Sequence, residues 1–327
     1  MSFEAEKTLA RAYWQACDAG EDVAGFYAES FIWDGPQPAP RATNISELKD
    51  AWLGPFAAAC PKMDRSIHIL MAGASDGRVD GGPDGCIWVG GTGYLTGTAK
   101  APLWSIPATD QKLRLRWGEF LCIEEGKIVE VHLAMDIMDW LEQIGLSVLP
   151  KFDGASHVWP APTAFDGVDF DATGTAKTLE LGRRLLFGGL NAFDETALTS
   201  MGMADYFHPN LKWYGPGGIG ACLSLKEFQD FHQGPWLRSF PDRKVQDLPL
   251  IAEGRLLGAC GPAAVKGTHG GDAFRSSGPG RGQPIEFSGL DFWLRTDDTF
   301  TENWVFVDFV KLFECMDINL MDRVRQL

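Results

Sequence analysis

Two segments of the chain place ionisable side chains at the alternate positions of an expected β-strand. In KIVEVHLAMD, the residues Glu130, His132 and Asp136 share one face, and valine, leucine and methionine share the other. The segment TFTENWVFVD repeats this pattern, with Trp304 in the place of the histidine and with Asp308 at its end. A carboxylate or imidazole with a pKa shifted by apolar surroundings suits proton removal next to a carbonyl. We therefore predict general acid–base chemistry, through an enolate, on this face.

Each of these residues also has a structural interpretation. Asp136 and Asp308 precede expected helices, where an aspartate commonly accepts backbone N–H groups as an N-cap. A single histidine in a strand, such as His132, is often a structural residue. Four residues of strand span ~13 Å, so His132 and Asp136 are too far apart for a hydrogen-bonded dyad, although they can flank a substrate.

The chain contains an internal repeat. Trp-Asp-Gly-Pro begins at Trp33 and Trp-Tyr-Gly-Pro begins at Trp213, an offset of 213 − 33 = 180 residues that also relates the downstream Gly-Pro pairs. Near the end of each copy the offset falls to 292 − 120 = 172, as between Phe120 and Phe292. We attribute the difference to a shorter loop in the second copy, in place of residues 76–85.

Each copy shows the same order of elements. An amphipathic helix comes first, then a short strand ended by Gly-Pro, a helix with a capping box, and strands separated by glycine-rich turns. This order predicts an α+β fold. The predicted strands are 31–34, 87–95, 113–123 and 127–135 with their repeats, and the predicted closing helices are 137–144 and 309–320. We divide the chain into a domain at 1–150, a linker at 151–175 and a domain at 176–327.

The composition limits the partners. The net charge is −15 and no basic run is present, which argues against nucleic acid and anionic membranes. No apolar stretch approaches the ~20 residues of a membrane span, and the start of the sequence lacks the features of a signal peptide, so we expect a cytoplasmic protein. The seven cysteines are scattered, and neither metal-ligand nor nucleotide-binding spacing is present. We expect no cofactor and no metal.

Longer motifs carry a resemblance to a known family. The second copy contains FHPNLKWYGPGG and GLDFWLRTDDTFTENWVFVD, and the first contains FYAESFIWDGP and WGEFLCIEEGKIVEVHLAMDIMDWLEQIG. Both copies resemble the SnoaL-like polyketide cyclases, within the nuclear transport factor 2-like and ester-cyclase group. The resemblance implies two tandem cone-shaped α+β barrels, each a curved antiparallel sheet wrapped around N-terminal helices. It also implies an apolar pocket at the open end of each cone, without metal or organic cofactor.

The resemblance also suggests roles for individual residues. The acid–base aspartate of the family matches Asp136 and Asp308, while His132 stands where the family usually has tryptophan. In ketosteroid-isomerase-like relatives the base lies near Asp34, which otherwise reads as a turn residue, and the second copy has Tyr214 there as a hydrogen-bond donor. Five aromatic residues are candidates for the pocket wall or for core packing: Trp104, Trp117, Phe120, Trp293 and Trp304.

These observations favour a cofactor-independent enzyme acting on a small, largely apolar carbonyl compound by cyclisation, isomerisation or elimination. The alternatives are a non-catalytic small-molecule-binding protein of the same fold and a protein-interaction scaffold. We expect the first copy to be the catalytic one, because it carries Asp34, His132 and Asp136. We also expect the two copies to pack as a pseudo-dimer through the face of Val129, Val131, Leu133 and Met135, and the whole chain to form a homo-oligomer if it associates further.

Overall fold

The computed structural model describes residues 3–75, 85–149, 154–155, 159–163, 171–194, 200–271 and 280–327. The turn expected to differ in length between the copies, and most of the expected linker, lie outside these residues. Among the described residues, no helix combines the length and apolar character needed to cross a membrane.

The first half runs from its opening helix to α4. Its five strands are ordered β1-β5-β4-β3-β2, with β1 parallel to β5 and all other neighbours antiparallel. Its elements are α1 (Glu4–Ala19), β1 (Tyr27–Asp34), α2 (Ile45–Leu48), α3 (Gly54–Ala59), β2 (Met63–Ala74), β3 (Ile87–Gly97), β4 (Leu113–Glu124), β5 (Lys127–Met135) and α4 (Ile137–Gln143).

The second half repeats this topology with a divided edge. Its sheet is ordered β7-β6-β12-β11-β10-β8, β9 also pairs with β10, and β6 is parallel to β12 as β1 is to β5. Its elements are α5 (Thr175–Arg183), β6 (Phe207–Tyr214), β7 (Ala221–Cys222), α6 (Leu225–Glu227), α7 (Gly234–Ser239), β8 (Lys244–Val245), β9 (Leu250–Glu253), β10 (Leu256–Thr268), β11 (Pro284–Thr296), β12 (Thr299–Val307), α8 (Phe309–Cys315) and α9 (Leu320–Gln326).

The helix ends follow local side-chain chemistry. The predicted N-caps are confirmed, because the side chains of Asn44 and Ser224 accept from the backbone N–H groups three residues later. The glutamates of the predicted capping boxes accept from the residue before each cap. The single closing helix predicted over 309–320 is wrong, since α8 ends at Cys315. Asp317 has φ +58°, and the N–H of Ile318 bonds the carbonyl of Phe313, which is a Schellman ending.

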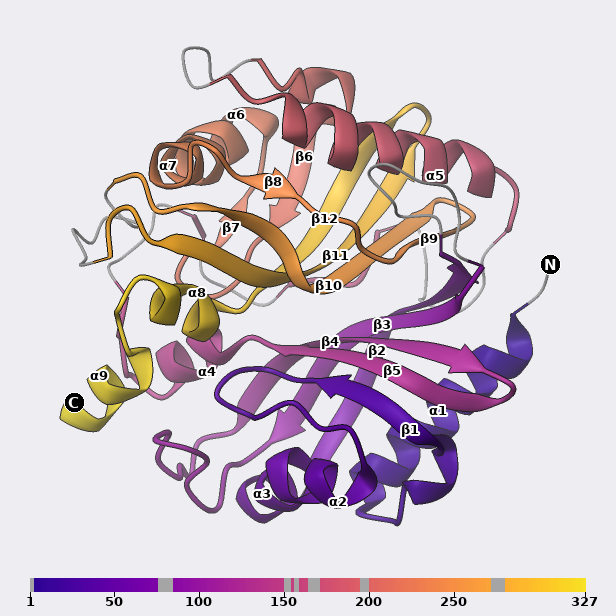
Figure 1. The fold of residues 1–327 in the computed structure, drawn as a ribbon, viewed down its shortest axis with the longest axis vertical. Helices are drawn as coiled ribbons and strands as arrows, with labels where there is room; N and C mark the ends of the chain where they lie inside the picture. The colour runs from indigo at the N-terminus through magenta and orange to yellow at the C-terminus, as the bar shows by residue number, and fades with distance from the viewer. Residues whose placement is uncertain are drawn as a thin grey trace.

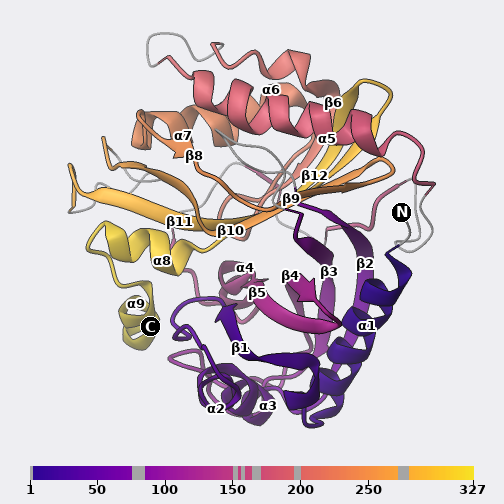
Figure 2. The same cartoon turned by 45° about the vertical axis from the view of Figure 1, so that its right-hand side comes forward.

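The two sheets pack face to face, and the main helices lie on the outer faces of both, so the layers run helices, sheet, sheet, helices (Figures 1 and 2). Between the sheets lies a buried cluster drawn from both halves, in which the rings of Phe120 and Phe292 stack with centroids 5.1 Å apart. Its larger members include Ile69, Met71, Trp88, Tyr94, Trp159, Ile251, Leu290, Trp304 and Phe306.

The assignment of the two faces of β5 from the sequence is wrong. His132 and Ala134 face the opposite half, whereas Val131, Leu133 and Met135 pack in the core of their own half. Of the predicted face, only Val129 packs against the cluster between the sheets. The reason is that both faces of the strand are buried, one by helices and one by the second sheet. Apolar residues are therefore expected on both faces, and alternation alone does not tell which face is which.

A reciprocal polar contact joins the halves. The carboxylate of Asp136 accepts the backbone N–H of Gly217 at 3.0 Å, and the carboxylate of Asp308 accepts that of Gln37 at 2.9 Å. In both cases the donor is the residue that follows Trp-x-Gly-Pro in the other copy. Each aspartate also accepts an N–H from its own helix, Asp136 from Asp139 and Asp308 from Lys311.

Gly217 allows one of these contacts. A Cβ atom at this position would lie 2.1 Å from the backbone nitrogen of Asp139, closer than any real contact. We therefore expect Gly217→Ala to lower the free energy of unfolding by roughly 1–3 kcal/mol through overpacking. Gly25→Ala is the matched control, because its Cβ would meet no atom within 4 Å. Urea denaturation of the two variants checks the difference, and equal stabilities would contradict this view of the contact.

Candidate active site

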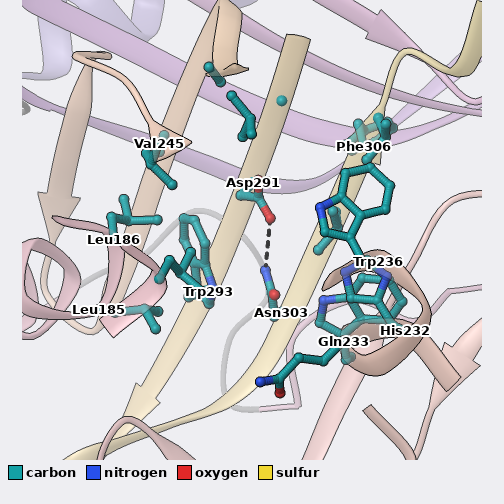
Figure 3. A pocket seen from close by; sticks show the side chains of 18 of the residues that line it. Leu185, Leu186, His232, Gln233, Trp236, Val245, Asp291, Trp293, Asn303 and Phe306 are labelled. Atoms are coloured by element: carbon teal, nitrogen blue, oxygen red, sulfur yellow. Dashed lines mark hydrogen bonds between the residues drawn. The ribbon is translucent and has the colours of Figure 1, made fainter. Parts of the chain in front are cut away.

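The second half encloses a mostly apolar cavity of about 150 Å³ between its helices and its sheet. The walls come from the segment after α5, from the α6–α7 region and from strands β10 to β12 (Figure 3). Apolar and aromatic side chains dominate the lining, including Leu185, Leu186, Phe228, Trp236, Val245 and Trp293. A cavity with such walls and a few polar groups is a typical small-molecule site.

Asp291 is the acidic group among the residues that line this cavity, which also include His232 and Arg243. It lies on β11, and the side-chain amide of Asn303 on the neighbouring β12 donates to its carboxylate at 3.4 Å (Figure 3). Burial raises the pKa of Asp291 to about 7, even though Asn303 and the more distant Arg116 both act to lower it. At neutral pH the carboxyl group is therefore divided between its two forms, and it can accept or release a proton.

Hydrogen-bond donors line the same cavity. The indole nitrogen of Trp293 is buried and has no hydrogen-bond partner among the described residues. The side-chain amide of Asn303 is already engaged, because it donates both to Asp291 and to the carbonyl of Phe292, the latter at 3.0 Å. His232 stacks on Trp213 with centroids 4.2 Å apart, and burial lowers its pKa to about 3, so it is neutral in the working range. The indole N–H of Trp293 thus suits a polarised carbonyl oxygen.

The first half has a corresponding cavity of about 120 Å³, which includes Trp117 and Glu119 in its lining. Glu119 is the repeat equivalent of Asp291, and burial also raises its pKa to about 7. It is already engaged, because the indole nitrogen of Trp14 donates to it at 2.6 Å. Sequence analysis missed both carboxylates. The available signal was a single acidic residue beside an aromatic in the same buried strand of both copies.

The residues predicted as catalytic lie outside both cavities. Asp34, His132 and Asp308 come together in a smaller cavity between the halves. The Nδ1 atom of His132 is 3.9 Å from the carboxylate of Asp34, and its Nε2 atom is 3.0 Å from Glu130. Neither Asp136 nor Tyr214 lines this cavity.

Asp136 and Tyr214 instead surround a buried arginine. The guanidinium of Arg116 lies 3.5 Å from the carboxylate of Asp136 and donates to the carbonyl of Tyr214 at 3.2 Å. Burial raises the pKa of Asp136, and the positive charge of Arg116 opposes that rise. The contacts of Asp136 are thus those of a helix cap and a buried ion pair, and its predicted catalytic role stays a prediction.

The five aromatic residues predicted to line a pocket do not all lie in one place. Trp117 and Trp293 line the cavities of the first and second halves. Phe120 and Trp304 belong to the cluster between the sheets, and Trp104 is partly buried with its ring centroid 6.1 Å from that of Trp52.

One group of described residues has atoms spaced for a metal ion. The ligand atoms of Cys86, Cys122 and Glu124 lie within 4.8 Å of one another. Burial strongly raises the pKa of Cys122, which favours the thiol over the thiolate that binds metals. None of the three residues lines the cavity of Asp291.

Comparison with known proteins gives matches among solved structures only. Three are named as candidate polyketide cyclases: a SnoaL-like one from Jannaschia sp. CCS1 (14% identity, 45% of this chain and 96% of that chain, TM-score 0.37), one from Xanthomonas campestris pv. campestris (20%, 43% and 98%, 0.35) and one from Pseudomonas putida KT2440 (23%, 41% and 94%, 0.32). Each match covers almost all of the solved chain but less than half of this one. No family model matches the sequence, and no curated protein does.

The fold is a tandem of two α+β units. The identities are below 25%, so the particular activity has to be argued from the cavities.

The ion pair between Arg116 and Asp136 leads to a stability prediction. Asp136→Ala leaves a buried guanidinium without its carboxylate and should cost ~3–5 kcal/mol of unfolding free energy. Asp308→Ala is the matched control, because it removes the equivalent cap and cross-half bond but leaves no buried arginine unpaired. Chemical denaturation should show a larger loss of unfolding free energy for Asp136→Ala than for Asp308→Ala. Equal losses would show that the ion pair with Arg116 contributes no stability beyond the helix cap.

Asp291 should leave a signature in the pH dependence of stability. Its folded pKa of about 7 lies above the usual ~3.9 of the unfolded chain. The folded state therefore holds a proton that the unfolded state releases, so this group lowers stability as pH rises from ~4 to ~7. Asp291→Asn removes the effect. We expect the variant to gain melting temperature relative to the unmodified protein between pH 4 and pH 8, and a constant difference across that range would contradict the raised pKa.

Proposed function

We propose that this protein is a cofactor-independent enzyme that acts on a small, largely apolar carbonyl compound in the cavity of the second half. The observation that supports the proposal is Asp291, a carboxyl group with a pKa of about 7, set among mostly apolar walls in the same cavity as the unpartnered indole N–H of Trp293. Because the base is desolvated, it is more basic than an exposed aspartate, which is what proton abstraction from carbon requires.

The chemical step follows from these positions. The Asp291 carboxylate takes a proton from the carbon next to the carbonyl, and the electron pair of that C–H bond moves to form an enolate. The indole N–H of Trp293 donates toward the enolate oxygen, where negative charge develops, while the amide of Asn303 holds the carboxyl group of Asp291 in place. Return of the proton to a different carbon gives isomerisation, attack of the enolate carbon on a second carbonyl gives cyclisation, and loss of a β-substituent gives elimination. The residues of the cavity serve all three outcomes.

The cavity geometry favours the second half over the first. Glu119 has a similar pKa, but its carboxylate is held by Trp14, and the ion pair of Arg65 with Asp18 lies nearby. Asp291 is bonded only to a neutral amide among the described residues, through a longer contact. Our expectation from the sequence had been the first copy, on the basis of residues that lie between the halves.

The test does not require the natural substrate. The probe is 2-tetralone, a bicyclic apolar ketone with acidic α-hydrogens, incubated with the protein in deuterium oxide while NMR follows the exchange of those hydrogens. We expect the protein to accelerate exchange above the buffer rate, with a rate that rises with pH through about 7 as Asp291 ionises. Asp291→Asn should reduce the protein-catalysed rate by ~10²–10⁴-fold.

Glu119→Gln is the matched control and should keep the full rate if the second half is the site. Loss of exchange in Glu119→Gln alone would assign the chemistry to the first half. Binding of the ketone without exchange, detected by tryptophan fluorescence, would favour the alternative of a non-catalytic binding protein. Exchange that persists unchanged in Asp291→Asn would refute the proposed base.

A further inference from the structure

Arg116 contacts the opposite half, but the equivalent position in the second copy holds no arginine. Its guanidinium donates to the backbone carbonyls of Tyr214 and Gly215, both at 3.2 Å, and to that of Val305, and it pairs with Asp136. It is a buried cation enclosed by three carbonyl oxygens and one carboxylate. The repeat equivalent of Arg116 is Ser288, so the second half offers no arginine at the matching place.

The equivalent acceptors surround a cavity. Under the offsets of 180 and 172, the carbonyl residues correspond to Asp34, Gly35 and Leu133, and the carboxylate corresponds to Asp308. All four, together with Ser288, line a cavity of about 60 Å³ between the halves. The chain therefore presents the same acceptor set twice, once filled by its own guanidinium and once around a cavity.

Further polar atoms border this second cavity. The side chain of His132 is 7% exposed, and its Nδ1 atom has no hydrogen-bond partner among the described residues. One carboxylate oxygen of Asp34 is likewise buried without a hydrogen-bond partner. Buried polar atoms without partners are costly unless a ligand or a water satisfies them.

The positive charges nearby are already engaged. Lys311 lines the cavity, but its ammonium group lies 3.0 Å from Glu286 and donates to the carbonyl of Pro262 at 2.8 Å. Arg41 lies 3.6 Å from the other oxygen of Asp34 with a side chain that is about half exposed. The lining thus presents two carboxylates and three carbonyls to any occupant, which favours a cation rich in N–H donors over an anion or an apolar group.

We propose that the cavity lined by Asp34, His132, Ser288 and Asp308 is a binding site for a small organic cation of the guanidinium class. The ligand would donate to the carbonyls of Gly35 and Leu133 and pair with Asp308, as Arg116 does with its own acceptors. The site is separate from the cavity of Asp291, and the proposal does not depend on the catalytic function.

The probe is guanidinium chloride at low millimolar concentration, well below denaturing levels, with tetramethylammonium chloride at equal ionic strength as the cation without N–H donors. We expect guanidinium alone to raise the melting temperature along a saturating curve. Ser288→Arg places an arginine of the chain's own at the site, and should abolish this response. An unchanged response in Ser288→Arg would place binding elsewhere and overturn the proposal.

Arg116→Ala is a second variant, and its result is independent of whether Ser288→Arg folds. This variant opens the filled acceptor set, so guanidinium should restore part of its lost stability. If guanidinium rescues Arg116→Ala but has no effect on the unmodified protein, the second cavity does not bind the cation and the proposal fails. A crystal structure of the unmodified protein with guanidinium tests the site directly. We expect planar electron density beside Asp308, and a cavity that holds only water would refute the site.

Discussion

The packing of one sheet against the other is the constraint on which the remaining features depend. It buries the second face of each central strand, so side chains that would be solvated in a single unit have to be apolar or find partners. Phe120 and Phe292 satisfy this by stacking on one another. Asp136 and Asp308 satisfy it by accepting backbone N–H groups from both halves. The same aspartates therefore cap a helix and hold the two units in register.

This constraint allows the copies to differ at some of the positions where they meet. A residue at the interface faces a different neighbour in each copy, because its environment is made by the other copy. Arg116 corresponds to Ser288, and His132 corresponds to Trp304. Inside the cones Glu119 and Asp291 keep the acidic charge, but their partners differ, since Trp14 donates to Glu119 and Asn303 donates to Asp291.

The location of the chemistry follows from solvation. Between the halves, Asp136 and Asp308 accept backbone N–H groups and lie near Arg116 and Lys311, which is an arrangement that holds a structure together. In the cavity of the second half, Asp291 is surrounded by apolar walls and a single amide. Desolvation without a strong partner leaves a carboxyl group able to exchange its proton near neutral pH.

Local patterns in the sequence determined the elements. The repeat, the N-caps at Asn44 and Ser224 and the strand from Lys127 to Met135 were all predictable, since each depends on residues close together in the chain. The break after Cys315 was signalled only indirectly, by Gly145 at the matching place of the first copy. Capping and strand alternation are short-range effects, so one sequence suffices to recognise them.

The tertiary structure alone decided what each polar residue does. The two-residue period of β5 placed His132 and Asp136 on one face, but which side of the sheet that face occupies depends on a second sheet more than a hundred residues away. The sequence did not predict a role for Glu119 or Asp291, because a lone acidic residue in a strand is expected to face solvent unless both faces of the strand are buried. Desolvation, which sets their pKa, comes from the surrounding packing and not from neighbours in the sequence.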